Sequence, residues 1–264
     1  MAISRDELPI DRICVGLFAV FGIAFLALAV PAALEPMTFW TGILLGDYAY
    51  PSHELHHLVL GMVFPVLLLG VIAQAYRPRR RVGPLYTAVC IWAALTVVFA
   101  IGGGFSPVQL VLLALLVGMV FTHPAGADQL PSLAALDRPV AVVAGLTALG
   151  ALTFSAVELN AHFVANDSHV GFDHYLFMAT AGVSTAGLAV VASFRPVGWR
   201  FPTYTVAFFL TVFGLGSVLY PGSEQGSSLG VFGLLVAVWA LLFLAVAERD
   251  RIVAERDRIT ELRG

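Results

Sequence analysis

Eight long apolar stretches constrain the fold of this chain more than any other feature of its sequence. They lie at about 13–34, 56–76, 84–102, 107–122, 139–160, 172–194, 203–220 and 228–247. A helix of about 17 to 25 apolar residues is long enough to cross a hydrocarbon core of roughly 30 Å. Charged residues make up only 12% of the 264 residues, far below the share found in soluble domains. The sequence therefore predicts an all-α polytopic membrane protein with about eight transmembrane helices.

The second half of the chain repeats landmarks of the first. His57 corresponds to His174, and Arg77-Pro78 corresponds to Arg195-Pro196, at offsets of 117 and 118 residues. Each half holds four stretches, and an even number of crossings gives the two halves the same orientation. We therefore predict two parallel four-helix membrane repeats and a cytoplasmic helical tail. Their bounds are 1–126, 127–247 and 248–264.

The arginines predict the orientation of the chain in the membrane. All fourteen Lys and Arg residues are arginine, and the loops on one side contain none of them. Those loops are 35–55, 103–106, 161–171 and 221–227. By the positive-inside rule, both termini face the cytoplasm of a multi-pass plasma-membrane protein. The absence of lysine also excludes a retinal protein, which needs a lysine for its Schiff base.

Two histidine-rich motifs stand at the predicted outer ends of equivalent helices. In the first, Ser52 is the expected N-cap, and His53 and His57 share one helical face because they are four residues apart. In the second, His169 and Asp173 have the same spacing, and His174 follows. Imidazoles and a carboxylate from two helices can form a metal site of three or four ligands. The predicted metal ligands are His53, His57, His169, Asp173 and His174.

Two methionines favour copper as the metal. Met62 and Met178 follow the histidine motifs in the same helices, and thioether sulfur is a soft ligand that prefers Cu(I). Glu35 and Glu158 close their apolar stretches near the outer surface, so neither is expected to relay protons in mid-membrane. No Ser-His-Asp, Walker or zincin motif indicates a particular enzymatic reaction. A transporter or a pH or metal sensor is an alternative, because imidazole titrates near neutral pH.

Three stretches carry a resemblance to a known family. Residues 53–69 resemble the histidine, leucine-rich and proline pattern of the CtaG family, and residues 169–182 are similar to its second histidine-bearing helix. Residues 220–239 resemble its ending of Tyr-Pro, an acidic residue with glutamine, glycine and tryptophan. CtaG proteins are membrane factors associated with copper insertion into cytochrome c oxidase. The resemblance implies a copper-handling or assembly factor with respiratory oxidase subunits as partners.

A second resemblance leads to a haem alternative. Glu54-Leu-His-His57 is similar to the helix-two motif of haem A synthase, itself an eight-helix parallel duplication. That resemblance implies a haem bound through His57 and His174, in an electron-transfer or haem-modifying protein. The seven-residue repeat in the tail, at 247–253 and 254–260, suggests a pairing surface for a homodimer. The lipid bilayer is the remaining expected partner, and no nucleic acid is expected.

Overall fold

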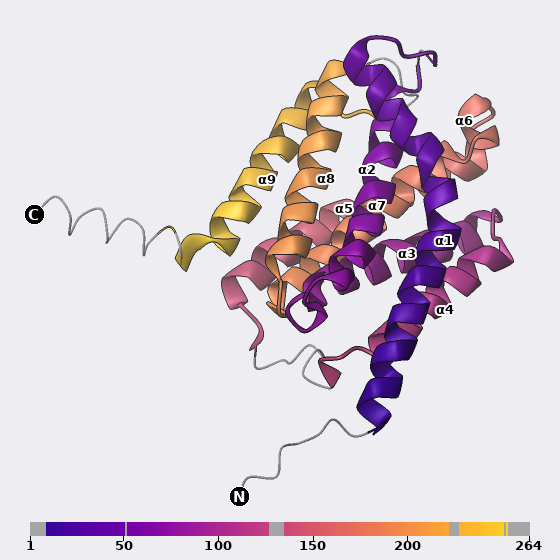
Figure 1. Ribbon diagram of the computed structural model, residues 1–264. Coiled ribbons are helices and arrows are strands. Elements are labelled where there is room, and N and C mark those ends of the chain that lie inside the picture. Colours follow the sequence, from indigo (N-terminus) through magenta and orange to yellow (C-terminus); the bar gives the residue numbers. More distant parts are fainter. Residues whose placement is uncertain (1–8, 51, 127–134, 222–226, 251, 253–264) are drawn as a thin grey trace, which may run out of the picture.

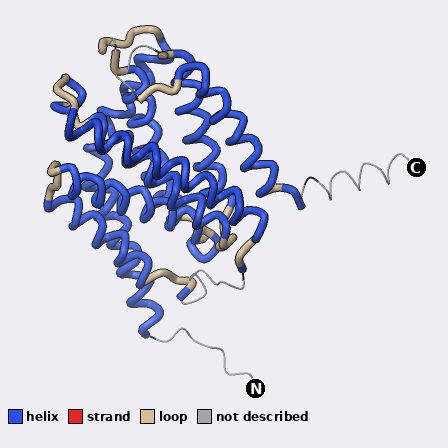
Figure 2. The backbone as a smooth tube through the Cα atoms, turned by 180° about the vertical axis from the view of Figure 1, so that it is seen from behind, coloured by secondary structure: helices blue, strands red, loops and turns tan. Residues whose placement is uncertain are grey.

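The computed structural model describes residues 9–50, 52–126, 135–221, 227–250 and 252, with only the backbone for residues 9–11. Helices, turns and loops make up this part of the chain (Figure 2). The α-helices are α1 (Pro9–Leu45), α2 (Glu54–Ile72), α3 (Val82–Gly102), α4 (Pro107–Phe121), α5 (Arg138–Val164), α6 (Ser168–Gly171), α7 (His174–Ser193), α8 (Arg200–Leu219) and α9 (Gly233–Ala247). Short 3-10 turns lie at Ala73–Ala75, Pro78–Arg80 and Gly230–Phe232.

The prediction of an all-α polytopic membrane protein is confirmed. Within the described residues, seven helices are long and apolar enough to cross a membrane, and α4 is a shorter apolar helix. Ser106 and Gln109 form a capping box that fixes the start of α4, where the sequence predicted the fourth stretch to begin. Apolar side chains such as those of Leu146 and Leu241 are exposed along the outer helices. That exposure suits contact with lipid rather than with water.

The helices pack in two matching sets around a shared centre (Figure 1). α1 contacts α2 and α4, as α5 contacts α7 and α9; α2 contacts α3, as α7 contacts α8. Across the middle, α3 packs on α7 and α2 packs on α8. The central helices α2 and α7 are therefore the most buried, and both begin at a histidine motif. Whether the two sets arose by duplication stays a prediction, as do the repeat boundaries.

The two loops that repeat the Arg-Pro pair share an unusual backbone. Arg77 and Arg195 both adopt left-handed conformations, with φ of 53° and 46°, and each precedes a proline. The two loops also touch, because the N–H of Gly83 donates a hydrogen bond of 2.8 Å to the carbonyl of Val197. These loops follow α2 and α7. The arginines therefore lie at the end of the bundle opposite to the histidine motifs.

Helix α1 is longer than the sequence predicted, and the expected loop after residue 34 is wrong. The helix continues to Leu45 through Pro31 and Pro36, because neighbouring helices can support proline in a membrane helix. The Trp40 indole N–H donates a hydrogen bond of 2.9 Å to the carbonyl of Leu58 on α2. A Cβ on Gly61 would collide with the Trp40 ring, so glycine makes room for it. These contacts hold the last turns of α1 against the start of α2.

An ion-pair cluster joins the ends of three helices at the arginine end. The Asp137 carboxylate lies 2.6 Å from Nε of Arg195 and 3.0 Å from Nη2 of Arg249. Its backbone N–H donates to the carbonyl of Ser193, the last residue of α7. Burial raises the pKa of Asp137, but hydrogen bonds from Arg249 and a backbone N–H and the two guanidinium charges outweigh burial and lower it. The cluster ties α5 to α7 and α9. The tail predicted to pair lies mostly outside the described residues.

Candidate metal centre

Four histidines gather where α2 and α7 begin. Each offers one nitrogen, and these nitrogens all lie within 4.8 Å of one another. The four are His53, His56, His169 and His174. Two come from the start of α2 and two from the α6–α7 region, so both halves of the chain contribute. His56, His169 and His174 are buried, with 5% exposure or less. A group of this kind could hold a metal ion.

Two residues with a left-handed backbone conformation directly precede histidines of the group. Ser52 has φ of 76° and Asp173 has φ of 56°, and they directly precede His53 and His174. The predicted N-cap at Ser52 is wrong: α2 begins at Glu54 with His53 as N-cap, because an N-cap residue normally adopts a φ in the β region. The His53 ring still lies beside the His57 ring, with their centroids 6.0 Å apart. Nδ1 of His53 lies 3.0 Å from Nδ1 of His174.

His56 and His57 point in different directions from the first turn of α2. The His56 ring lies 5.0 Å from the ring of His174, between centroids, and belongs to the four-histidine group. The His57 ring stacks on Phe39 at 3.8 Å and 7°, and its Nδ1 hydrogen-bonds the Tyr48 hydroxyl at 2.5 Å. Phe39 belongs to the extension of α1, and Tyr48 follows it. His57 thus borders the group, with its ring centroid 5.1 Å from that of His174.

Asp167 organises the short helix that carries His169. Its carboxylate accepts a hydrogen bond from the backbone N–H of His169 at 2.9 Å and caps α6. The same carboxylate lies 3.4 Å from His169 Nδ1 and accepts the Tyr175 hydroxyl at 2.8 Å. Burial raises the pKa of Asp167, but these hydrogen bonds and the neighbouring imidazole outweigh burial and lower it. The other ring nitrogen of His169 lies 3.4 Å from the carbonyl of Ser52. His169 is therefore held from both sides.

A buried carboxylate supports His56 from α5. His56 Nε2 lies 3.2 Å from Oγ of Ser227, and that hydroxyl donates a 2.8 Å hydrogen bond to Oε2 of Glu158. Ser227 and Glu158 are each only 1% exposed. The prediction that Glu158 lies at a helix end near the surface is wrong. Helix α5 continues to Val164, so Glu158 lies inside it and faces the bundle.

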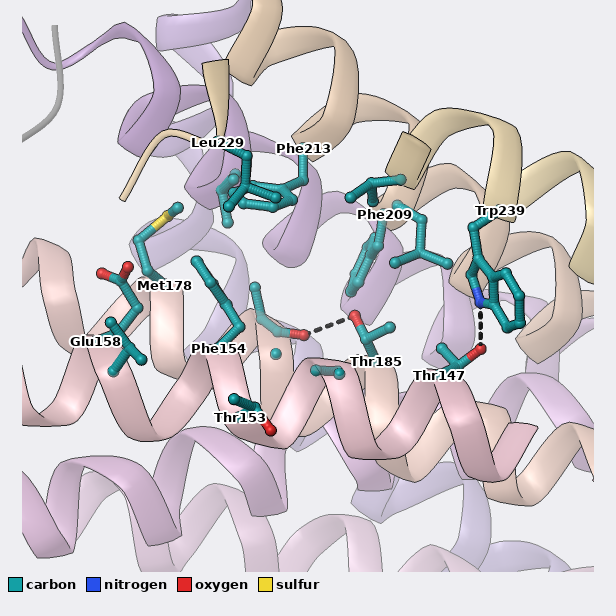
Figure 3. Close-up of a pocket in the computed structure, with 18 of the residues that line it drawn as sticks. Thr147, Thr153, Phe154, Glu158, Met178, Thr185, Phe209, Phe213, Leu229 and Trp239 are labelled. Atoms are coloured by element: carbon teal, nitrogen blue, oxygen red, sulfur yellow. Dashed lines mark hydrogen bonds between the residues drawn. The ribbon is translucent and has the colours of Figure 1, made fainter. Parts of the chain in front are cut away.

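An apolar cavity of about 730 Å³ extends from Glu158 between α2, α5, α7, α8 and α9 (Figure 3). Met62 and Met178 line it, as do aromatic side chains that include Phe154 and Phe213. At its far end the Trp239 indole N–H donates a 2.9 Å hydrogen bond to the Thr147 hydroxyl. Glu158 is the charged residue in this lining. The cavity and the histidine group therefore meet at the Glu158–Ser227–His56 chain of hydrogen bonds.

The predicted ligands are placed unequally. His53, His169 and His174 belong to the four-histidine group, whereas His57 borders it. Asp173 is the N-cap of α7 and lies outside that group. His56 was not among the predicted ligands, although it stands in the same motif.

Two further residues were also missed, Ser227 and Glu158. Glu158 gave a usable signal, because an acidic residue within a long apolar stretch is costly unless it has a partner or a function. Ser227 gave none, because a serine in a polar loop is unremarkable until the fold brings it to His56. No protein-family model, curated protein or solved structure matches this chain.

Proposed function

We propose that this membrane protein binds a transition-metal ion through His53, His56, His169 and His174. The observation that carries the proposal is the convergence of four imidazoles from both halves of the chain within 4.8 Å. Ligand nitrogens of a tetrahedral site lie about 3.3 Å apart when each metal–nitrogen bond is about 2.0 Å. Side-chain rotations that move each nitrogen by about an ångström bring the four nitrogens to that spacing. Imidazole ligands suit zinc, copper, iron and nickel.

The contact between His53 and His174 supports an ion at this point. A hydrogen bond between two Nδ1 atoms 3.0 Å apart requires that one carries a proton and the other presents a lone pair. For both Nδ1 atoms to coordinate an ion as neutral imidazoles, the shared proton would move to Nε2 of the ring that carries it. The two nitrogens then separate by only about 0.3 Å. Metal binding at this pair is therefore coupled to a change of histidine tautomer.

The polar contacts behind the ligands have the arrangement that metal sites use. A ligating histidine usually donates its other N–H to a carboxylate, a carbonyl or a bridging group, which fixes its tautomer and orientation. His56 has Ser227 and Glu158 in that position, and His169 has Asp167 and the Ser52 carbonyl. When one nitrogen of His169 binds the ion, its contact on that side gives way and the other contact remains. These supports hold the site before the ion arrives.

Copper handling for a respiratory oxidase is the specific role that we propose for this site. It rests on the resemblance of residues 53–69 and 169–182 to the CtaG family, and on a site rich in imidazole, which suits copper. The orientation predicted from the arginines puts the site at the outer face of the plasma membrane. Haem is the alternative, but a porphyrin needs an open slot between two axial imidazoles. The ring of His174 is instead packed against His53 and His56, with centroids 4.8 and 5.0 Å away.

Elemental analysis of purified protein tests the proposal. The protein in detergent is loaded with Cu(I), Cu(II) or Zn²⁺, passed through a desalting column, and its metal content and optical spectrum are measured. We expect about one ion per chain and no Soret band. His56→Ala and His174→Ala should each weaken binding about 10- to 100-fold or more, because each removes a ligand.

His162→Ala is the matched control. His162 is a histidine near the same end of the bundle, but its Nε2 contacts the carbonyl of Gly102 and it is outside the group. This variant should keep the metal content of the wild type. Equal loss in His162→Ala and His56→Ala would refute the assignment, and so would a wild-type protein that retains no ion. A Soret band in the purified protein would show that the protein binds haem, and the haem alternative would then replace the metal proposal. If the protein preferred Zn²⁺ over both copper ions, the metal site would be supported and the role in copper handling would be refuted.

A further inference from the structure

The apolar cavity beside α5 opens sideways toward the surroundings of the bundle. Its lining includes Leu146 and Val157 of α5 and Leu235 of α9, which are 54%, 55% and 67% exposed. All three belong to helices that are long and apolar enough to span a membrane. The opening therefore lies at membrane depth. Molecules that reach it come from the lipid phase.

The cavity has a long apolar body and one charged end. Thr147 and Glu158 lie 11 positions apart on α5, which corresponds to about 16 Å along the helix at 1.5 Å per residue. Along that path the cavity is lined by Phe154, Phe213 and other apolar side chains. At one end stands the buried carboxylate of Glu158, and at the other the Trp239–Thr147 hydrogen bond closes the path (Figure 3). A site of this form suits a chain with a polar group at one end.

We propose that this cavity binds a single-chain membrane lipid whose head group donates a hydrogen bond, such as a long-chain alcohol. The hydrocarbon chain lies along α5 toward Trp239. The head group hydroxyl donates to the Glu158 carboxylate, which already accepts the Ser227 hydroxyl and has further lone pairs. An ionised Glu158 carboxylate would also repel an anionic head group in a medium of low polarity. The assignment does not depend on a bound metal.

The head group at Glu158 lies close to the histidine group. Glu158 is joined through Ser227 to His56, one of the four histidines. A lipid head group at Glu158 therefore lies one hydrogen-bonded side chain away from the histidine group. The cavity then presents a membrane-soluble molecule to the polar centre without passage through water.

Photolabelling with three probes of the same chain tests this proposal. Photoreactive hexadecanol, photoreactive palmitate and photoreactive hexadecane are each added to the protein in lipid nanodiscs, and the labelled peptides are mapped. We expect hexadecanol to label α5 and α9 lining peptides saturably, with unlabelled hexadecanol as an effective competitor. Palmitate and hexadecane should label these peptides about tenfold more weakly. Glu158→Gln should reduce the preference for hexadecanol over palmitate.

Two glycines of α5 provide a matched pair of variants. A Cβ at Gly150 or at Gly145 meets no atom within 4 Å, so both positions accept a larger side chain without a backbone clash. Gly150 lines the cavity and Gly145 does not. Gly150→Phe should reduce hexadecanol labelling of the lining about tenfold or more, and Gly145→Phe should leave it unchanged.

Three results would overturn the proposal. Labelling that does not saturate, or that is equal in Gly150→Phe and Gly145→Phe, would mean surface lipid only. Equal labelling by hexadecane and hexadecanol would refute the proposal that Glu158 binds the head group. The measurement is repeated after treatment with a chelator, so that a failure of metal binding is separated from a failure of lipid binding. Saturable labelling in metal-free protein supports the lipid site even if no ion binds.

Discussion

The Nδ1 atoms of His53 and His174 lie 3.0 Å apart, although the two residues are separated by 121 positions in the chain. Each histidine follows a residue with a left-handed backbone, at the start of one of the two central helices. The contact therefore joins the two sets of helices at one point. Any ion bound there stabilises the arrangement of α2 against α7, because an ion that binds only the folded state adds its binding free energy to stability.

Ser227→Ala should weaken metal binding about 10- to 100-fold without removing a ligand. The substitution breaks the path from Glu158 to His56, so the His56 ring loses the contact that orients it. Metal affinity is measured by competition with a chromophoric chelator. The neighbouring Ser228 donates to the Ser217 carbonyl instead, so Ser228→Ala should leave the affinity unchanged. Equal effects of the two variants would argue against the orienting role.

Substitutions at Asp173 distinguish a ligand from a turn residue. Because Asp173 has φ of 56°, glycine fits that position without strain, whereas alanine costs about 1–2 kcal/mol there. We expect Asp173→Gly to retain the metal, and Asp173→Ala to lower stability and weaken binding by shifting His174. Metal content and thermal unfolding are measured side by side. Loss of the ion from Asp173→Gly would instead make the carboxylate a ligand, as the sequence predicted.

Gly61→Ala should destabilise the protein by about 1–3 kcal/mol, because the new methyl group collides with the Trp40 ring. The displaced end of α1 carries Phe39, so the stacking of this ring on His57 should also be lost. Denaturant unfolding in detergent micelles measures the change. Gly16→Ala on α1 is the control, since its Cβ meets no atom within 4 Å. A Gly61→Ala protein as stable as Gly16→Ala would refute the packing of Trp40 on α2.

His123 should make the folded protein less stable as the solution becomes acidic. Burial lowers the pKa of His123 to about 4, and its Nδ1 accepts a hydrogen bond from the N–H of Ala125. The unfolded chain binds a proton near pH 6.5 and the folded chain only near pH 4. His123 therefore does not lower the unfolding free energy above about pH 6.5, and it lowers that free energy progressively as the pH falls toward about 4.

Unfolding free energies of metal-free protein between about pH 7 and pH 4 check this slope. In His123→Gln, the slope of the unfolding free energy with pH should be smaller by the equivalent of up to one proton. Glutamine does not titrate in this range. His162→Gln controls for the removal of a histidine at the other end of the bundle. The interpretation of His123 fails if the wild type and His123→Gln have the same pH dependence.

Much of the fold was predictable because the signal is carried by local stretches of the chain. Apolar runs of membrane-spanning length located most of the helices, and the fourth run began where α4 begins. The end of α1 was not predictable in this way. Pro36 suggests a helix end when it is read alone, and only the contact between Trp40 and α2 explains why the helix continues.

The candidate site was predictable as a region and less so as a set of ligands. Both motifs were recognised from the density of histidines, and three of the predicted ligands belong to the group. His57 was chosen because it lies four residues after His53, but its ring stacks on Phe39 and contacts the Tyr48 hydroxyl. Phe39 reaches His57 only because α1 continues beyond Pro36, which the apolar stretches did not predict.

By itself, the sequence determined that the chain crosses a membrane with helices and that its two histidine motifs lie at one end of them. Both properties follow from the order of apolar and polar residues along single segments. Only the tertiary structure decided which imidazoles meet, that Ser227 and Glu158 stand behind His56, and that a cavity lies beside Glu158. The physical reason is that these contacts join segments far apart in the chain. Their partners depend on how whole helices pack, which no local pattern encodes.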